Sequence, residues 1–417
     1  MKIETGKVNM CRSKWKRKTL TAAVLFSVTC GWAQTKVVTL DLTPYGVMTD
    51  AELSVLHTIA GYIVAGPPGG IAWGGVGTLA IDSAGYVYVG LPIWASGDAP
   101  KNPVRGTGDK FRVLAVNAAN GGKVERTMDF PSKSLDRLAL HLADDGTLLV
   151  FANDTLMRVG SDGRPTAQLA VPNEQKQVDN WDVDISTTGG TLRLRLNNQH
   201  TIVVNAKTLA VEKQCQEKEE EDDTGTMTDD LELSSRSTGT SPNTANGLER
   251  ETFCEKGSIL SSFGKINFVP AIVSDNQFLA IEEGSMALRK LSGETVWTSN
   301  PPAPLLFDSR EGRYELNRDS GTYEGRYELS RDASRVTIQL LRVAQYQPPE
   351  TQETRPMQVE DSVGVWDVAT GRLVGEVPLL GHTTDRFFNP DSKTAVSPDG
   401  KLLAVLEEGV LTVWRVE

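Results

Sequence analysis

The chain has 417 residues, of which 39% are hydrophobic, 6% aromatic and 23% charged, and its formal net charge is −11. This composition excludes a disordered, collagen-like or membrane-embedded protein. The length allows one large domain or two medium ones.

Residues 1–33 have the pattern of a secretory signal peptide. Five basic residues between positions 12 and 18 precede the apolar run 20–30, which is too short to span a bilayer. Gly31 and Ala33 are small residues at −3 and −1 of a cut after Ala33. We therefore expect a periplasmic or secreted protein that begins at Gln34. A lipoprotein signal ending at Cys30 is the alternative, although the residues before it fit that pattern poorly.

Loss of the signal also changes the charge. Residues 1–33 carry seven basic side chains and one acidic one, so the processed chain has a formal net charge of −17. Binding to nucleic acid needs clustered Lys and Arg, and we expect none. No other apolar stretch approaches the roughly 20 residues of a membrane span. We expect a soluble monomer.

Two cysteines remain after processing, Cys215 and Cys254, and an oxidising compartment favours a disulfide between them. The segment between them, 216–253, contains eleven acidic and three basic residues. Such a stretch buries little apolar area, so it is expected to be a disordered, solvated insertion. A cation-binding or partner-docking role is the alternative.

The most informative pattern is a hairpin that occurs six times. Each copy is a short apolar strand, a turn of Ser, Asp, Asn or Gly, and a second alternating strand. The six hairpins span residues 79–89, 140–150, 183–194, 269–280, 327–338 and 394–405.

Each hairpin is followed by a third strand, and all but the last by a fourth as well. Four antiparallel strands per unit, at spacings of about 40–45 residues once loops are discounted, indicate an all-β propeller. The last unit stops after its third strand, 411–416, and the segment 35–42 resembles the missing fourth strand. We expect these two strands to pair and close a ring. The pattern predicts six blades, or seven if residues 47–72 form a degenerate one.

Some repeats resemble those of a known superfamily. Residues 363–372, the turn 397–401 and the pair Trp414-Arg415 resemble repeats of bacterial WD40-type and YVTN-type propellers, and 287–297 is similar to a quinoprotein-type repeat. The resemblance implies a propeller over most of residues 35–417. The tryptophan typical of quinone-dependent dehydrogenases occurs once, at Trp297, and adjacent cysteines are lacking, so that activity is not expected.

Long connections are predicted at one face only. Turns between first and second strands are short, whereas connections between second and third strands, or between units, hold every long insertion. Loops on a rigid scaffold commonly carry binding sites. The candidate binding residues on this face are Trp73, Trp94, Arg105, Tyr346 and His382. One insertion holds a tandem duplication, 311–320 repeated as 324–333, whose first copy is expected to form an extra strand or a protruding loop.

The sequence shows no catalytic signature. The four histidines are far apart, and no nucleophile, phosphate-loop or metal motif is present. We expect no catalytic residue, no metal ligand and no cofactor. The leading hypothesis is a non-catalytic protein that binds an envelope protein, a peptide or a glycan. The alternatives are a lactonase-like or lyase-like enzyme with an axial metal, and an accessory propeller of envelope assembly.

Overall fold

The computed structural model describes part of the chain in nineteen ranges. These are residues 34–46, 79–93, 110–131, 139–171, 183–188, 190–196, 200–216, 225–228, 231–237, 245–251, 259–266, 271–274, 276–282, 285–299, 313–322, 327–347, 355–379, 393–407 and 409–416. Within these ranges the protein is all-β, with two short 3-10 turns and no α-helix. None of the described segments is a helix long and apolar enough to cross a membrane.

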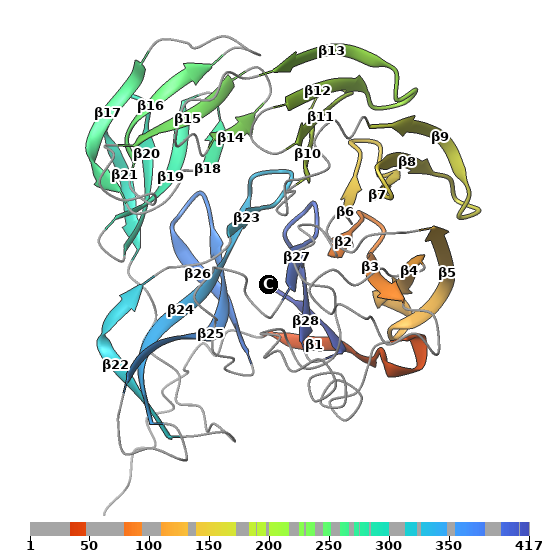
Figure 1. The fold of residues 1–417 in the computed structure, drawn as a ribbon. Helices are drawn as coiled ribbons and strands as arrows, with labels where there is room; N and C mark the ends of the chain where they lie inside the picture. The colour runs from red at the N-terminus through yellow and green to blue at the C-terminus, as the bar shows by residue number, and fades with distance from the viewer. Residues whose placement is uncertain are drawn as a thin grey trace, which may run out of the picture. The chain divides into compact units, whose positions relative to one another are not determined.

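The described strands form seven antiparallel sheets, which we number in chain order (Figure 1). Sheet 1 contains β2 (Leu79–Ile81), β3 (Tyr86–Ile93), β4 (Lys110–Asn117) and β5 (Lys123–Pro131). Sheet 2 contains β6 (Ala139–Leu142), β7 (Leu148–Ala152), β8 (Thr155–Val159) and β9 (Pro165–Ala170). Sheet 3 contains β10 (Val183–Thr188), β11 (Thr191–Leu196), β12 (His200–Asn205) and β13 (Val211–Gln216). Sheet 4 contains β14 (Gly225–Thr228), β15 (Leu231–Ser237), β16 (Ala245–Glu251) and β17 (Ile259–Ile266).

The remaining three sheets come from the C-terminal part of the chain. Sheet 5 contains β18 (Ala271–Ser274), β19 (Gln277–Glu282), β20 (Ser285–Lys290) and β21 (Thr295–Ser299). Sheet 6 contains β22 (Arg313–Thr322), β23 (Tyr327–Leu329), β24 (Arg335–Gln347), β25 (Arg355–Asp367) and β26 (Arg372–Pro378). Sheet 7 contains β27 (Lys393–Val396), β28 (Leu402–Glu407), β29 (Val410–Arg415) and β1 (Thr35–Asp41).

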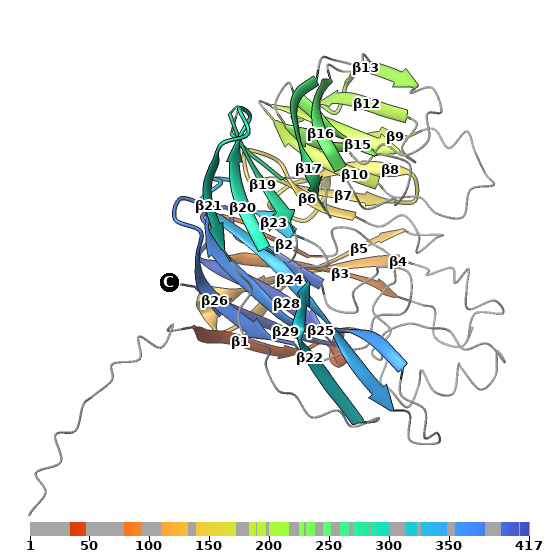
Figure 2. The ribbon, with the colours of Figure 1, turned by 90° about the vertical axis from the view of Figure 1, so that its left-hand side faces the viewer.

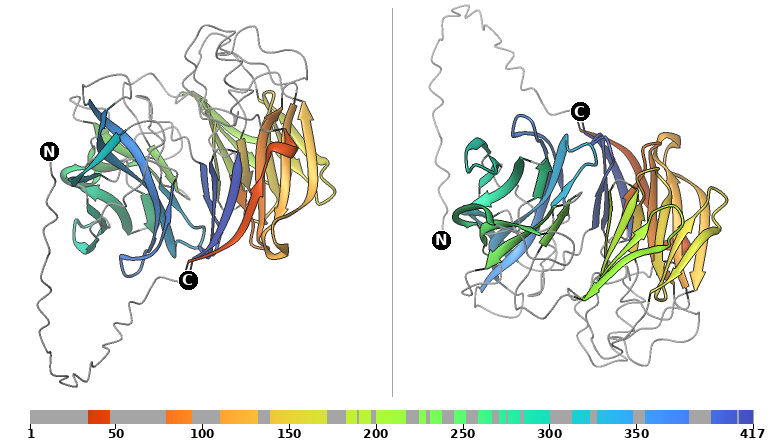
Figure 3. Two further views of the ribbon diagram at one scale, coloured as in Figure 1. Left: turned by 90° about the horizontal axis from the view of Figure 1, so that it is seen from below. Right: turned by 90° about the horizontal axis from the view of Figure 1, so that it is seen from above.

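All six predicted hairpins are confirmed as antiparallel pairs of first and second strands. The predicted pairing between the two ends of the chain is also present. Strand β1 pairs with β29, with Val38 opposite Val413 and Asp41 opposite Val410. In Figure 3 the red strand lies beside the dark blue ones. The first strand of the described chain therefore completes the last sheet.

Apolar residues on both faces of the sheets explain why the sheets pack on one another. In β4, Val113 and Ala115 join a buried cluster shared with sheet 2, whereas Leu114 and Val116 join a cluster shared with sheet 7. Side chains of a strand alternate between faces, so this continuous apolar run covers both. Further clusters lie between sheets 2 and 3, 5 and 6, and 6 and 7.

Polar links reinforce these apolar contacts. Trp297 of sheet 5 donates its indole N–H to the carbonyl oxygen of Val368 in sheet 6 at 2.9 Å. Gly371, at φ +68°, lies so close to this indole that a Cβ there would be 2.4 Å from a ring carbon. Trp366 is fully buried in the same cluster. These tryptophans pack between sheets, as the sequence predicted; Trp181 lies outside the described residues.

The acidic segment differs from its prediction. Strands β14, β15 and β16 lie within 216–253, which we expected to be disordered. Together with β17 they form sheet 4. That expectation is wrong because alternating Leu and Met in 225–237 supply a strand pattern among the acidic residues. Six repeats were predicted and seven sheets are described, the additional one being sheet 4.

The tandem duplication forms the predicted extra strand. The first copy gives β22, which pairs with the outer half of β24, where Tyr314 lies opposite Tyr346. The second copy gives β23, which pairs with the inner half, where Tyr327 lies opposite Ile338. Two nearly identical segments thus lie in succession along one 13-residue strand, and Figure 2 shows β22 beside the long β24–β25 pair.

The junction between the two chain ends can be tested at Val38, which is 3% exposed and packs on Gly122 of sheet 1. Val38→Ala removes buried methyl groups, and we expect a loss of about 1–3 kcal/mol in the free energy of unfolding, measured with urea. The exposed neighbour Thr39 serves as a control, and Thr39→Ala should be close to neutral. Equal effects of the two substitutions would contradict the packing described for β1.

Candidate functional site

The candidate site is the group of turns that join first to second strands, where polar side chains from several sheets meet. Two of these turns have the same internal hydrogen bonds. The Ser330 hydroxyl donates to Asp332 at 2.8 Å and accepts from the Arg335 N–H at 2.9 Å. Ser397 donates to Asp399 at 2.7 Å and accepts from the Leu402 N–H at 2.9 Å. The repeated Ser-x-Asp pattern therefore serves the turn itself.

The aspartates of these turns are ionised and locally bonded. Burial raises the pKa of Asp332 and of Asp399, but hydrogen bonds outweigh it and leave both below the ordinary value. The partners are Ser334 and Ser330 for Asp332, and Ser397 and Lys401 for Asp399. In another of these turns, Oδ1 of Asp82 accepts hydrogen bonds from the N–H groups of Ala84 and Tyr86, both at 2.9 Å. The sequence interpretation of these residues as turn formers, not metal ligands, agrees with this geometry.

Five of the turns are also hydrogen-bonded to the segment that follows the third strand of their own sheet. In five sheets a carbonyl oxygen of the turn accepts from the N–H that follows the third strand, at 2.8–3.1 Å. The acceptors are Gly85, Gly190, Asn276, Ser334 and Lys401, and the donors are Ala118, Ala206, Leu291, Val368 and Val416. This shared bond fixes the turns as a rigid layer.

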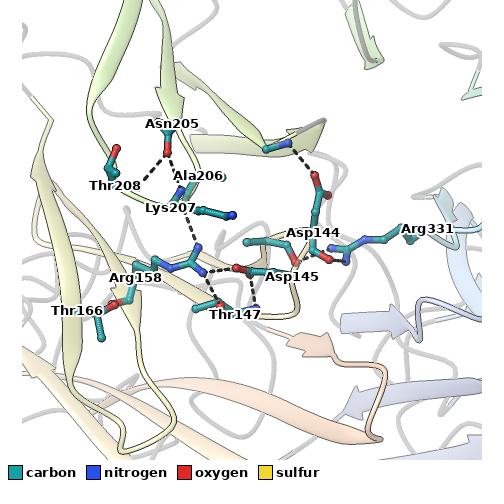
Figure 4. Close-up of polar contacts among 12 residues, drawn as sticks. Asp144, Asp145, Thr147, Arg158, Thr166, Asn205, Ala206, Lys207, Thr208 and Arg331 are labelled. Carbon is teal, nitrogen blue, oxygen red and sulfur yellow. Dashed lines mark hydrogen bonds and ion pairs between the residues drawn. The ribbon is translucent and has the colours of Figure 1, made fainter.

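Arg331 joins two sheets that share no apolar cluster. It lies in the β23–β24 turn of sheet 6, and its guanidinium donates to three carbonyl oxygens of the β6–β7 turn in sheet 2. The acceptors are Leu142 at 2.8 Å, Ala143 at 3.1 Å and Asp144 at 3.2 Å. Figure 4 shows Arg331 approaching this turn. The guanidinium of arginine presents five N–H donors in a rigid planar fork, whereas the ammonium of lysine is a compact charge on a flexible stem.

Further bonds connect the turns of neighbouring sheets. The Asp332 N–H donates to the Pro398 carbonyl at 3.1 Å, from sheet 6 to sheet 7. The Gly190 N–H of sheet 3 donates to Oδ2 of Asp144 in sheet 2 at 3.2 Å. The turns of sheets 2, 3, 6 and 7 are thus bonded to one another.

Arg158 forms a second link between sheets. From β8 it pairs with Asp145, donates to the Thr147 hydroxyl at 2.8 Å, and reaches the Ala206 carbonyl of sheet 3 at 2.7 Å (Figure 4). Burial raises the pKa of Asp145, but hydrogen bonds from Thr147 and Arg158 outweigh this effect. The pKa of the carboxyl is therefore below its ordinary value. Arg158 thus connects one turn of sheet 2 to the next sheet.

His141 lies on β6 beside this network. The residue is half-buried, and burial is the largest cause of a pKa lowered to about 4. The charge of Arg331 also lowers this pKa, and Asp144 opposes it. The residue is neutral at physiological pH. The sequence interpretation of His141 as structural fits this environment.

The chemistry available at the turns is limited. Among the described residues, no group of three or more His, Cys, Asp or Glu is placed to hold a metal ion. The Arg331 guanidinium adds a positive charge where these turns meet, which disfavours a divalent cation there. The polar groups named above bond to one another. This end is suited to holding sheets together.

Most sequence-predicted binding residues cannot be placed. Trp73, Trp94, Arg105 and His382 lie outside the described residues. Tyr346 lies on β24, where its Cα partners are Tyr314 and Arg355. The disulfide stays a prediction, because Cys215 lies on β13 but Cys254 is outside the described ranges.

Sequence reasoning missed Arg331 and Arg158. Arg331 occupies the turn position that Pro398 holds in the matching hairpin, and a long cation there was the available signal. Arg158 interrupts an apolar strand, but nothing local indicates that its partner lies 48 residues away.

Comparisons with known proteins give structural similarity only. A scan against protein-family models and a search of curated proteins produced no match. A chain in a crystal structure of the mitotic checkpoint complex is 11% identical, with 100% of this chain and 99% of that chain covered and a TM-score of 0.48. The β-propeller domain of Cps50 (Swd1) from Myceliophteria thermophila is 12% identical, with 83% and 98% covered and a TM-score of 0.43. At TM-scores this low, neither similarity carries an argument about fold or function.

The Arg331 link is tested by Arg331→Met, which leaves three turn carbonyls without this donor. We expect the free energy of unfolding to fall by about 1–2 kcal/mol, with faster amide hydrogen exchange in residues 142–147. The exposed Arg164 provides the matched control, because Arg164→Met should leave exchange in that turn unchanged. A wild-type exchange rate in Arg331→Met would contradict the link.

His141 makes stability depend on pH. In the unfolded chain it takes up a proton near its ordinary pKa of 6.5, whereas the folded protein resists protonation until about pH 4. The stability that the neutral imidazole contributes is therefore fully present above pH 6.5. As the pH falls from 6.5 toward 4, the free energy of unfolding decreases by about 3 kcal/mol.

The matched variant is His141→Gln, which cannot titrate. Urea unfolding of wild type and variant is measured from pH 7 to below pH 4, and the decline between pH 6.5 and 4 should be steeper for wild type. The two curves should become parallel below about pH 4, where the folded histidine is also protonated. Parallel curves throughout would contradict a depressed pKa.

Proposed function

We propose that residues 34–417 form an exported, WD40-like β-propeller of seven blades that binds an envelope protein, a peptide or a glycan without catalysing a reaction. Each proposed blade is one of the seven sheets. Neighbouring strands in a sheet follow one another in the chain, with two exceptions. Sheet 6 has a fifth strand, so that both β22 and β23 pair with β24, and sheet 7 includes β1. Consecutive antiparallel sheets of four strands are the form of propeller blades.

The order in which sheets pack supports a closed ring. Buried clusters join sheet 5 to 6, 6 to 7, 7 to 1, 1 to 2 and 2 to 3. Sheets 4 and 5 are in contact through β14 with β18 and β17 with β19. The remaining junction of the proposed ring would lie between sheets 3 and 4, where only residues 217–224 separate β13 from β14.

Export is proposed from the sequence alone. The basic and apolar pattern of residues 1–33 favours a secretory signal cleaved after Ala33. The formal charge of −17 on the remaining chain favours a soluble protein without affinity for nucleic acid. A periplasmic or secreted location follows from these features as part of the proposal.

The proposed binding end is the one opposite the tight turns. In sheet 6 the second and third strands, β24 and β25, have 13 residues each, whereas the corresponding strands in the other six sheets have five to eight. Their pairing continues to Tyr346 opposite Arg355, and β22 lies along the outer half as an edge strand. An edge strand has backbone groups that can pair with an extended peptide. This elongated end of sheet 6 is the observation on which the proposed function depends.

The strand register allows a clean test. Leu341 lies opposite Glu360, so an Asn-Gly turn can join them in place of residues 342–359, with 311–323 also removed. The inner half, which carries the buried Val336, Ile338 and Val365, is retained. We expect unchanged melting but about a tenfold or greater loss of partner capture from an envelope extract, quantified by mass spectrometry.

A matched variant shortens sheet 1. An Asn-Gly turn replacing residues 94–109 joins Ile93 to Lys110, which are Cα partners. This variant should retain the proteins that the shortened sheet 6 loses. If the sheet 1 variant loses them and the sheet 6 variant does not, the binding end has been assigned to the wrong sheet. Capture unchanged in both would overturn the proposed function.

A further inference from the structure

The two copies of the tandem duplication lie along one edge of strand β24. The first copy, 311–320, and the second copy, 324–333, have the same residue at eight of ten positions. The first supplies β22 and the second β23, and both pair with the edge of β24 opposite the one that pairs with β25. A single strand edge thus accepts two segments of nearly identical sequence.

The inner place on β24 uses residues that both copies contain. Leu329 lies opposite Val336 and packs against the cluster between sheets 5 and 6. Arg331 donates to the turn of sheet 2, and Oδ1 of Asp332 accepts from the Ser334 N–H at 2.9 Å. The first copy has the same three residue types at the matching positions, as Leu316, Arg318 and Asp319. It carries the side chains that these contacts need.

At the outer place the first copy fits less well. Its pairing with β24 is interrupted between Leu316 and Gly321, where residues 317–320 lie opposite the single residue Val343. These four residues match 330–333, which belong to the tight turn after β23. The first copy therefore has a turn sequence in the middle of a strand. Such a conflict between local sequence and strand pairing disfavours this arrangement.

We propose that the first copy exchanges with the second copy on β24. In the exchanged pairing, Glu315 takes the place of Glu328 opposite Thr337, and the longer loop 317–335 replaces the tight turn. The second copy cannot move to the outer place in return, because hydrogen bonds of the tight turn hold it beside the start of β24. Exchange therefore leaves the outer half of β24, residues 341–347, without β22.

The pairing in the structure is the more stable of the two. The Ser330 hydroxyl closes the tight turn by donating to Asp332 and accepting from the Arg335 N–H, and the first copy has Asn317 at that position. Exchange also gives up the pairs between β22 and β24. Loop-closure entropy grows only slowly with length, so the longer loop alone does not prevent exchange. The exchanged pairing is thus a minor state.

Exchange would regulate the binding end of sheet 6, and this consequence rests on the proposed function. The uncovered edge of β24 offers backbone N–H and C=O groups to an extended peptide, which would pair there as an added strand. A peptide that binds only the exchanged pairing increases the population of that state. The first copy then acts as a cover that the partner displaces.

Paired cysteines detect the exchange in the full-length protein. Glu315 lies opposite Gln345, so Glu315→Cys and Thr337→Cys are separated in the structure by about 27 Å along β24. A disulfide needs Cα atoms within about 7 Å, which only the exchanged pairing provides. The matched variant combines Glu328→Cys with the same Thr337→Cys, and these two positions are Cα partners in the structure.

Under a mild oxidant we expect the matched pair to close first. The pair at 315 and 337 should close more slowly, within one chain, and digestion with mass spectrometry locates each disulfide. No disulfide between 315 and 337, under conditions in which the matched pair is complete, would overturn the exchange. A disulfide found only between two chains, or one that forms no faster than the protein unfolds globally, would overturn it as well.

A fluorescent peptide with the sequence of β22, residues 313–322, probes the uncovered edge. In the form closed between 315 and 337 the outer half of β24 is free of β22, and fluorescence anisotropy should show binding at least tenfold tighter than to the form closed between 328 and 337. Equal binding to the two forms would overturn the regulation. Neither measurement uses the partner captured from an envelope extract, so failure of the proposed function is seen separately.

Discussion

The fold depends on sheets whose strands are apolar on both faces. In β7, Leu148 and Val150 pack toward sheet 1 while Leu149 and Phe151 pack toward sheet 3. Such a sheet cannot expose either face to water without losing about 1.5–3 kcal/mol for each large side chain. Every sheet of this kind needs two neighbours, and a row of them always leaves an unprotected face at each end. The closed ring proposed above is the simplest arrangement without such ends.

The same requirement explains why the first and last strands share sheet 7. If β1 stayed within a sheet of its own, the final unit would present β29 as an exposed edge with unpaired backbone groups. Pairing β1 with β29 satisfies those groups and places Val38 and Leu42 in the cluster between sheets 7 and 1. The first described strand is therefore part of the structure that holds sheets 7 and 1 together.

Local sequence patterns made much of this fold predictable. Contacts between residues far apart in the sequence could not be predicted from such patterns. The six hairpins were found because a turn such as Ser-Pro-Asp-Gly sits between two strands within a dozen residues. Sheet 4 was missed because net acidity outweighed a weak alternation in 225–237. The lengths of β24 and β25 depend on pairing between distant positions such as Tyr346 and Arg355, and the Arg331 contact crosses 189 positions to Leu142. No local spacing encodes either.

The two ends of the sheets differ in how their polar groups are used. At the tight turns, Asp144 and Arg331 already bond to neighbouring turns, and the Asp332 carboxylate bonds within its own turn. A ligand there would have to replace internal bonds that are individually worth about 1 kcal/mol. At the opposite end, β24 and β25 stay paired as far as Tyr346 opposite Arg355, and a duplicated segment adds β22 along them. Additional strand pairing there leaves the buried clusters of the inner half unchanged. Strands at that end can therefore lengthen or gain partners without disturbing the core. This is the physical reason to expect partner binding at the elongated end of sheet 6 and a structural role for the tight turns.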